Sequence, residues 1–232
     1  PWAGEVRALG WAGVRAVGST GLETEEPGVR DRRPRVAAVV LAAGMATRMG
    51  ALKQVLPVEG EPMVRRVVGT CLAAGLAPVW VVTGFGAEAV EAALGGLPAA
   101  VRYVHNPNYK EGQAASLKAG VHAALADKAA AALAVLLADQ PFVRVATLRR
   151  LAALALEPGV LAAAASYGSG RPGPPCVLRR PLWPQVLALT GDRGARAVLL
   201  AAGDGLRTVP VSAEELRDID APGDVPPDLP GR

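Results

Sequence analysis

The chain has 232 residues, of which 51% are hydrophobic and 20% charged, so a sizeable core is available and global disorder is excluded. A formal net charge of +4 suits a phosphate-rich ligand, but aromatic residues are only 4% and no basic run is interleaved with them, which argues against nucleic acid as a partner. Because Cys71 and Cys176 form no disulfide or zinc pattern, and no apolar run approaches the ~20 residues of a membrane span, we expect a cytoplasmic protein.

The two ends of the sequence differ from the stretch between them. Residues 1–34 show no sustained period of 2 or 3.6, and Pro27, Gly28 and Pro34 would interrupt a helix or strand. The last residues are rich in proline. We therefore expect a disordered extension over 1–34, one folded domain over 35–225, and a loose tail over 226–232.

Between these ends, apolar strands alternate with helices. Apolar runs bounded by glycine or proline predict strands at 36–41, 78–83, 101–104, 133–137, 160–165 and 206–211. Helical periodicity predicts helices at 63–72, 87–94, 113–125, 145–156 and 195–202, the first with Pro62 at its first position. This alternation is typical of a mostly parallel sheet covered on both faces, a three-layer αβα Rossmann-like fold. Ligands of such folds bind beyond the carboxyl ends of the strands, so we expect ligand-binding residues in the loops after the strands.

The loop after the first predicted strand reads LAAGMATRMG over 41–50 and is followed by Lys53. Its small residues allow backbone N–H groups to face an anion, and Arg48 and Lys53 add positive charge for phosphates. The spacing fits neither a dinucleotide-binding GxGxxG nor a P-loop. From these residues alone, an ordinary strand–helix turn with two surface cations is the alternative.

A second group of polar residues follows the third predicted strand. Asn106 and Pro107 are followed by EGQAASL over 111–117, which enters a predicted helix. Gly112 permits close approach of a ligand, and Ser116 lies in the first helical turn, where free N–H groups point outward. A capped helix start with no ligand would explain the same pattern.

Two acidic segments lie late in the sequence, and the first predicts a metal ligand. Asp139 comes directly after a fully apolar strand, where burying it unpaired would be costly, and Mg²⁺ coordination would compensate that cost. Asp218 and Asp220 lie in DIDAPGD over 218–224 and share one face of an extended stretch. The alternatives are a helix N-cap for Asp139 and a polar surface turn for the second segment.

The sequence GDRGAR over 191–196 is a fifth segment of interest, preceded by a glycine- and proline-rich run over 170–175 that we expect to be a rigid loop. Asp192 and Arg196 are candidates for ligand contact. A helix start with an acidic residue near its positive end explains Asp192 almost as well. His105 and His122 lack any catalytic or metal-binding spacing around them, and we expect no role for either.

These five segments, in this order, resemble those of the MobA-like nucleotidyltransferases, and are most similar to the molybdenum cofactor cytidylyltransferases. The resemblance covers roughly 36–225 and includes DQP at 139–141, which favours the cytidylyltransferase over the guanylyltransferase branch. The sequence departs from the family at Ala46, where Ser or Gly is usual, and at Ala221 and Gly223, where Thr and Glu are usual.

The resemblance implies a role for each segment. It implies that Arg48, Lys53 and Asp139 are catalytic, and that Asp139 and Asp220 hold the metal. The implied nucleotide-binding residues are Leu41, Ala42, Ala43, Gly44, Arg48, Lys53, Thr83, Gly84, Asn106, Gly112 and Ser116. Asp192 and Arg196 would contact the acceptor.

The reaction that the resemblance implies is Mg²⁺-dependent transfer of CMP from CTP to the phosphate of the molybdenum-pterin cofactor, with release of pyrophosphate. A client molybdoenzyme or its chaperone would be a further partner. Two alternatives stay open: use of GTP or another NTP or acceptor, and a non-catalytic maturation factor that hands a bound molecule to a client enzyme. Asp139, Lys53 and Arg48 favour catalysis, because a pure binding protein needs no metal carboxylate.

Overall fold

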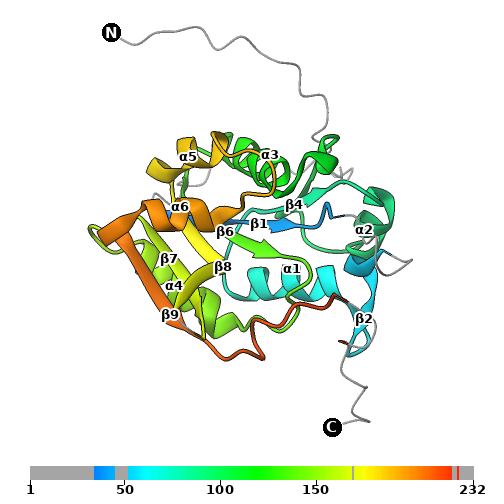
Figure 1. Ribbon diagram of the computed structural model, residues 1–232. Helices are drawn as coiled ribbons and strands as arrows, with labels where there is room; N and C mark the ends of the chain where they lie inside the picture. The colour runs from blue at the N-terminus through cyan, green and yellow to red at the C-terminus, as the bar shows by residue number, and fades with distance from the viewer. Residues whose placement is uncertain (1–33, 45–51, 169, 221–223, 225–232) are drawn as a thin grey trace, which may run out of the picture.

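The computed structural model describes residues 34–44, 52–168, 170–220 and 224. Arg48, nearly all of the expected extension and the whole of the expected tail lie outside these residues. The centre is a seven-stranded sheet in the order β5-β4-β1-β6-β8-β7-β9, with a separate two-stranded hairpin, β2-β3 (Figure 1). The strands are β1 (Arg35–Leu41), β2 (Pro57–Val58), β3 (Glu61–Pro62), β4 (Val79–Thr83), β5 (Val101–His105), β6 (Ala130–Leu137), β7 (Ala162–Tyr167), β8 (Arg171–Arg179) and β9 (Leu206–Pro210).

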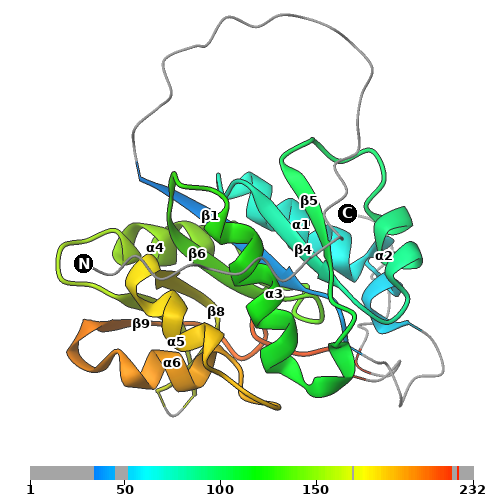
Figure 2. The same cartoon turned by 90° about the horizontal axis from the view of Figure 1, so that it is seen from above.

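Helices cover both faces of the sheet. They are α1 (Met63–Ala73), α2 (Ala87–Ala93), α3 (Gln113–Leu125), α4 (Val145–Ala155), α5 (Trp183–Leu187) and α6 (Ala195–Ala201). Helices α3, α5 and α6 lie next to one another over one face, with α1 and α4 behind the sheet (Figure 2). In β1, Ala37 and Val39 pack into the core on the α3 side, whereas Val36, Ala38 and Val40 pack on the α1 side. This two-sided burial explains the continuous apolar strands and confirms the predicted three-layer αβα fold.

The sheet is mostly parallel, as predicted, and β8 is its one antiparallel strand among the described residues. The expectation of a rigid loop over 170–175 is wrong, because Arg171–Arg179 forms β8 between β6 and β7. Only Cys176–Arg179 pairs with β6, and the earlier part pairs with β7 alone. Pro174 and Pro175 fall at a register shift, where neither has a paired partner. Proline lacks an N–H donor, so a bulge at the free edge of a strand tolerates it.

Two smaller differences between the predicted and the observed elements also involve proline. Helix α5 was not predicted; it is short and carries Pro184 in its first turn, where the missing N–H costs nothing. Pro62 belongs to β3 and precedes α1 rather than opening it. None of the helices in the described part of the chain combines the length and the apolar character that crossing a bilayer requires.

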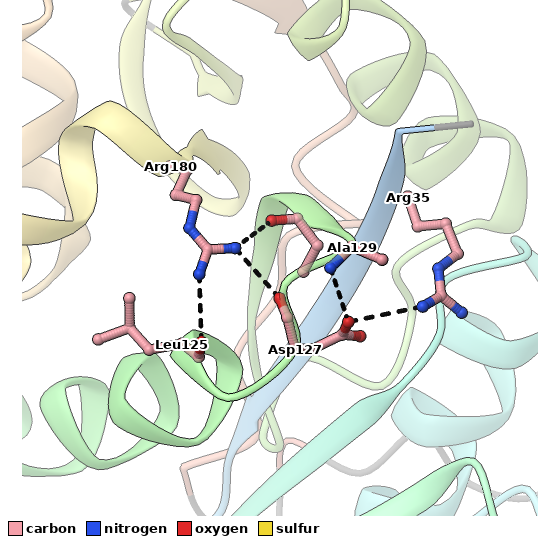
Figure 3. A network of polar contacts seen from close by, with 6 residues as sticks. Arg35, Leu125, Asp127, Ala129 and Arg180 are labelled. Carbon is pink, nitrogen blue, oxygen red and sulfur yellow. Dashed lines mark hydrogen bonds and ion pairs between the residues drawn. The ribbon is translucent and has the colours of Figure 1, made fainter. Parts of the chain in front are cut away.

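A polar network fixes the end of the sheet where β1 and β6 begin (Figure 3). The Arg180 guanidinium donates to the carbonyl oxygens of Leu125 at 3.1 Å, Asp127 at 3.1 Å and Ala130 at 3.0 Å. The Asp127 carboxylate accepts from the Ala129 N–H at 3.0 Å and pairs with Arg35 at 3.5 Å. These contacts hold the α3–β6 turn at the edge opposite to the carboxyl ends of the parallel strands, where the motif residues lie.

Candidate functional site

Three charged residues from distant motifs meet at the carboxyl edge of the sheet. Lys53 opens a short 3-10 helix (Lys53–Val55), Asp139 follows β6, and Asp220 follows β9 across the sheet. The Lys53 Nζ lies 2.7 Å from Asp139 Oδ2 and 2.9 Å from Asp220 Oδ1. One ammonium group therefore bridges two carboxylates that lie far apart in the sequence.

The electrostatics of this contact are strong because it is partly sheltered from water. Burial lowers the pKa of Lys53, but the charges and hydrogen bonds of Asp139 and Asp220 outweigh this effect, so the pKa is raised. Asp139 Oδ1 is buried and has no hydrogen-bond partner among the described residues. A carboxylate oxygen left in this state is costly, which makes Asp139 a group that gains from a further cation.

The segment that carries Asp220 is fixed against Asp139 by its backbone. The Ile219 N–H donates to the Asp139 carbonyl oxygen at 3.0 Å, and the Ile219 side chain is fully buried against Val58 and Met63. Asp218 alternates with Ile219 along the backbone, and the nearby Gln140 side chain lowers the pKa of its carboxyl group, an effect that is outweighed. Burial and the charge of Asp139 raise the pKa of Asp218. Two acidic side chains of this segment are thus directed at the loop after β6.

A cavity of about 380 Å³ opens beside Lys53 and Asp139. It is lined by Leu41, Ala43, Gly44, Lys53, Gln54, Tyr109, Lys110, Gly112, Gln113, Ser116, Leu137, Ala138, Asp139 and Asp192. Lys53 and Asp139 make part of its wall charged, while Leu41 and Tyr109 pack on the apolar core of the α3 side. The cavity therefore offers a charged region and an apolar region, as a nucleotide requires.

The second motif forms the wall of this cavity and its support. Ser116 lines the cavity, and its Oγ accepts a hydrogen bond from the Asn106 Nδ2 at 3.1 Å. Asn106 is 1% exposed, its N–H donates to the Thr83 carbonyl oxygen at 2.8 Å, and its Oδ1 accepts from the Asn108 N–H at 3.0 Å. Asn106 therefore sits behind Ser116 and fixes the loop between β5 and α3.

Several motif residues do not face the cavity through their side chains. Ala42 is buried on the α1 side, and its N–H donates to the Val82 carbonyl oxygen at 2.9 Å, so that amide is already engaged. The backbone N–H groups of this turn that we expect to contact an anion are therefore those of Ala43 and Gly44. Thr83 is fully buried, with its hydroxyl unpartnered within the described structure. Its side chain therefore supports the site from behind.

Two glycines permit the close packing around the cavity. A Cβ at Gly84 would lie 2.7 Å from Tyr109 Cβ and 2.9 Å from Ala43 Cβ, so the loop after β4 can pass here only without a side chain. Gly112 has a φ of +100°, and a Cβ there would lie 2.6 Å from Asp192 Oδ1. Because residue 112 has no side chain, Asp192 can lie directly against the second motif.

The two candidate acceptor residues are separated. Asp192 lines the 380 Å³ cavity, whereas Arg196 lines another cavity of about 280 Å³. A larger cavity of about 580 Å³ lies between α1 and the start of α4, but none of the predicted site residues lines it. The candidate site is therefore chosen by the motif residues that line the 380 Å³ cavity and not by cavity size.

Six cavity-lining residues were not among the predicted site residues: Gln54, Tyr109, Lys110, Gln113, Leu137 and Ala138. Gln54 is 2% exposed, and its Nε2 donates to the Gly44 carbonyl oxygen at 2.8 Å, which ties the first motif to the Lys53 segment. A polar side chain inside the apolar run 52–58 was the available signal for it. Tyr109 gave no comparable signal, because its position depends on contact with Gly84.

The sequence and the fold are similar to those of several known proteins. Residues 38–207 match the model of the MobA-like NTP transferase domain. The chain is 34% identical over 198 residues to the purine catabolism protein PucB of Bacillus subtilis, covering 82% of this chain and 94% of that protein. A nucleotidyl transferase from Methanothermobacter thermautotroptrophicus is similar in structure, with 31% identity, a TM-score of 0.70, and coverage of 82% of this chain and 94% of that one.

A third similar protein is Rv0371c from Mycobacterium tuberculosis, with 29% identity, a TM-score of 0.68, and coverage of 82% and 95% of the two chains. Rv0371c is also known in complex with manganese, and that structure shares 27% identity and a TM-score of 0.60 over 76% of this chain and 88% of its own. The family match spans more than half of the sequence and includes Lys53, Asp139 and the loop between β5 and α3. The chain therefore belongs to the MobA-like NTP transferase family and is a nucleotidyltransferase.

Proposed function

We propose that this nucleotidyltransferase moves CMP from CTP to the phosphate of the molybdenum-pterin cofactor and releases pyrophosphate, with Mg²⁺ as the metal ion. The observation that carries the proposal is the bridge of Lys53 to Asp139 and Asp220 beside the nucleotide-sized cavity. Phosphoryl transfer needs positioning and charge neutralisation more than a side-chain nucleophile. Lys53 supplies a positive charge for phosphate oxygens, and the two carboxylates supply negative charges for a metal ion.

The residues fit a divalent cation. Asp139 has a buried oxygen without a partner, and Asp220 is 63% exposed, so its carboxylate can turn toward an ion. No three His, Cys, Asp or Glu side chains of the described residues could hold an ion by themselves. Two carboxylates completed by phosphate oxygens and water is the coordination that Mg²⁺ favours. Bound there, Mg²⁺ would neutralise phosphate charge; the manganese complex of Rv0371c supports a divalent ion of this kind.

The chain's own residues have separate tasks in the reaction. Lys53 is proposed to hold the triphosphate, together with Arg48 and the N–H groups of Ala43 and Gly44. An oxygen of the acceptor phosphate bonds to the α-phosphorus while the bond from that phosphorus to the β-bridging oxygen breaks, and pyrophosphate leaves with the electron pair. Asp139 and Asp220 would keep the metal beside the α-phosphate.

The base is proposed to be cytosine for two reasons. The DQP segment at 139–141 favours the cytidylyltransferase branch by resemblance. In addition, Leu41 and Tyr109 lie on the apolar part of a cavity of only about 380 Å³, which suits a single-ring base better than a purine.

The test is pyrophosphate release with molybdenum-loaded pterin and Mg²⁺, supplying one NTP at a time. We expect kcat/KM to be at least about tenfold higher with CTP than with GTP, a discrimination of only ~1.4 kcal/mol. Equal rates or a preference for GTP would remove the cytidylyl assignment. Tight nucleotide binding without any pyrophosphate release, whichever NTP is supplied, would favour a non-catalytic maturation factor.

A further inference from the structure

The cavity of about 580 Å³ between α1 and the start of α4, here called the α1–α4 cavity, contains a buried carboxylate. Glu215 lines this cavity and is only 5% exposed. Its Oε1 accepts a hydrogen bond from the Arg144 N–H at 3.0 Å, but its Oε2 has only the Arg144 Nε, at 3.9 Å, within the described residues. That distance is too long for a hydrogen bond, and the Arg144 side chain is 66% exposed. A buried carboxylate oxygen in this state favours a further donor that carries a positive charge.

The other charged residues of the α1–α4 cavity also favour a cation. Arg66 pairs with Glu59 at 2.8 Å, and Glu61 pairs with a neighbouring arginine of α1 at 3.5 Å. Glu214 is exposed, and its carboxylate forms no ion pair or hydrogen bond among the described residues. Arg66 Nε is unpartnered within the same residues but fully buried, so a ligand in the cavity does not reach it. Two carboxylates and only one guanidinium, that of Arg144, therefore remain for a ligand.

Much of the remaining lining is apolar. Pro141, Phe142 and Val143 line the same cavity, and Gly69 of α1 leaves open space there, because no atom lies within 4 Å of a Cβ at this position. The ring of Phe142 already accepts one cation, since the Arg217 guanidinium lies 4.7 Å from its centre. A volume of about 580 Å³ is typical of sites for small organic molecules. A ligand with a positive charge at one end of an apolar body would match this lining.

The walls of the α1–α4 cavity continue into the two segments that carry the proposed metal ligands. The segment after β6 enters the cavity two residues beyond Asp139, and Glu215 lies five residues before Asp220. The hydrogen bond from the Arg144 N–H to Glu215 joins these two segments, and the contact between the arginine and the aromatic ring joins them again. A ligand in this cavity would therefore hold both segments at once.

We propose that the α1–α4 cavity is an effector site for a small organic ammonium ion, which binds to Glu214 and Glu215 and raises the metal affinity of the candidate site. The binding is independent of the proposed reaction, whereas the effect on the metal rests on the metal assignment of the proposed function. A bound ammonium ion fixes both segments before the metal arrives, so less ordering is left for the metal to impose. By linkage, the metal strengthens binding of the ammonium ion by the same factor.

The first experiment titrates the protein with three probes of similar shape, the phenethylammonium ion, neutral phenethyl alcohol and the hydrocinnamate anion. Chemical shifts in nuclear magnetic resonance spectra report binding. We expect the ammonium ion to bind at least about tenfold more tightly than the alcohol, because it adds a charge-assisted hydrogen bond, and the anion to bind more weakly than either. Equal binding of the ammonium ion and the alcohol, or a preference for the anion, overturns the site.

A charge substitution locates the bound probe. Glu215→Gln keeps an oxygen that accepts from the Arg144 N–H but removes the negative charge. We expect its affinity for phenethylammonium to fall at least about tenfold, with little change for the alcohol. Glu157→Gln is the matched control, because it removes the same charge from an exposed position beyond the other end of α4. Equal phenethylammonium affinity in these two variants places the probe elsewhere.

A steric substitution tests the same cavity without changing its charge. Gly69→Leu places a side chain into the open space beside α1, so it should abolish binding of both phenethylammonium and the alcohol. Gly69→Ala adds one methyl group only, and its affinities should stay within about twofold of the wild type. Unchanged binding to Gly69→Leu overturns the site even where Glu215→Gln fails to fold.

The effect on the metal is measured as Mn²⁺ affinity by electron paramagnetic resonance in the absence of nucleotide. Saturating phenethylammonium should raise this affinity about fivefold, and saturating Mn²⁺ should raise the phenethylammonium affinity by the same factor. Binding of the probe without any change in Mn²⁺ affinity overturns the effector role. A lowered Mn²⁺ affinity means that the probe competes at Asp139 and Asp220, which also overturns it. If the wild type binds no Mn²⁺, the metal assignment fails and the effector role with it, while the probe titrations still decide the cavity.

Discussion

The two halves of the sheet form cavities in different ways. In the parallel half, β5-β4-β1-β6, the strands end at the same edge, and short motifs in the loops after them line the cavity of about 380 Å³. In the other half, β8-β7-β9, residues of β7, β8 and α6 line a cavity of about 280 Å³. We call it the arginine-lined cavity, because Arg171 and Arg196 are among the residues that line it. The comparison teaches that one edge of a parallel sheet gathers residues from several loops, whereas beyond β6 a cavity depends on how individual strands and helices pack.

The largest expected effect on kcat comes from a substitution in the parallel half of the sheet. Asp139→Asn should reduce kcat by at least about a thousandfold, because the neutral amide removes one of the two negative charges proposed to hold the metal ion. The mutant should remain folded, since the amide is the same shape as the carboxylate. Pyrophosphate release and circular dichroism measure the two outcomes, and near-normal turnover in Mg²⁺ would contradict the metal assignment.

Lys53→Met should have the next largest effect, because it should lower kcat and raise the affinity for Mn²⁺. The ammonium lies between Asp139 and Asp220, so its removal should lower kcat by about a hundredfold or more through lost phosphate neutralisation. The same change removes the competing ammonium group from Asp139 and Asp220, so Mn²⁺ should bind more tightly in the absence of nucleotide. Free Mn²⁺ measured by electron paramagnetic resonance reports this second effect.

Lys128→Met is the matched control, because Lys128 is exposed near the start of β6, at the opposite edge of the sheet from Asp139. It should change neither kcat nor Mn²⁺ affinity. If Lys53→Met weakens Mn²⁺ binding, the lysine does not compete for the metal position, and its contact with the two carboxylates serves only to hold the loop.

The contrast between the halves also explains what could be predicted from the sequence. Strands β1, β4 and β6 are continuous apolar runs, so both their existence and the loops after them could be located. β8 could not, because Pro172, Pro174 and Pro175 are typical of a loop, and only the register shift against β7 makes them compatible with a strand.

The residues of the candidate site also divide into those that the sequence could predict and those that it could not. Lys53 and Asp139 follow neighbouring parallel strands, so their proximity was predictable from the carboxyl-edge rule. Asp220 comes after β9, at the far edge of the sheet, and its return to Asp139 could be expected only from the family resemblance. The contact of Gln140 with Tyr167 depends on tertiary packing between the β6 loop and β7, which no local pattern encodes.

A smaller effect is expected from a glycine in the parallel half. A Cβ at Gly120 of α3 would overlap the Val39 side chain of β1, so Gly120→Ala should lower the free energy of unfolding by about 1–3 kcal/mol despite better helix propensity. Gly69→Ala in α1 is the control: no atom lies within 4 Å of its new Cβ, so it should stabilise by up to about 1 kcal/mol. Urea unfolding measures both, and equal stability of the two variants would contradict the close α3–β1 packing.

The smallest expected effect concerns a glycine that lines the arginine-lined cavity. A Cβ at Gly173 would lie 2.7 Å from Tyr167 Cε2, so Gly173→Ala should displace the Tyr167 ring and cost under about 1 kcal/mol of stability. Tyr167 and Arg196 line the same cavity, so if Arg196 contacts the acceptor, as the family resemblance implies, the acceptor KM should rise about threefold, or ~0.7 kcal/mol, with the KM for CTP unchanged. Gly168→Ala, whose Cβ meets no atom within 4 Å, should alter neither constant.

A double-mutant cycle then separates the ring contact from a general backbone effect. In a Tyr167→Leu background the smaller side chain leaves room for the new methyl group, so Gly173→Ala should add no further change in the acceptor KM. If Gly173→Ala has the same effect in both backgrounds, the contact with Tyr167 is not the cause. If it instead raises the KM for CTP as much as that for the acceptor, the arginine-lined cavity does not act on the acceptor alone.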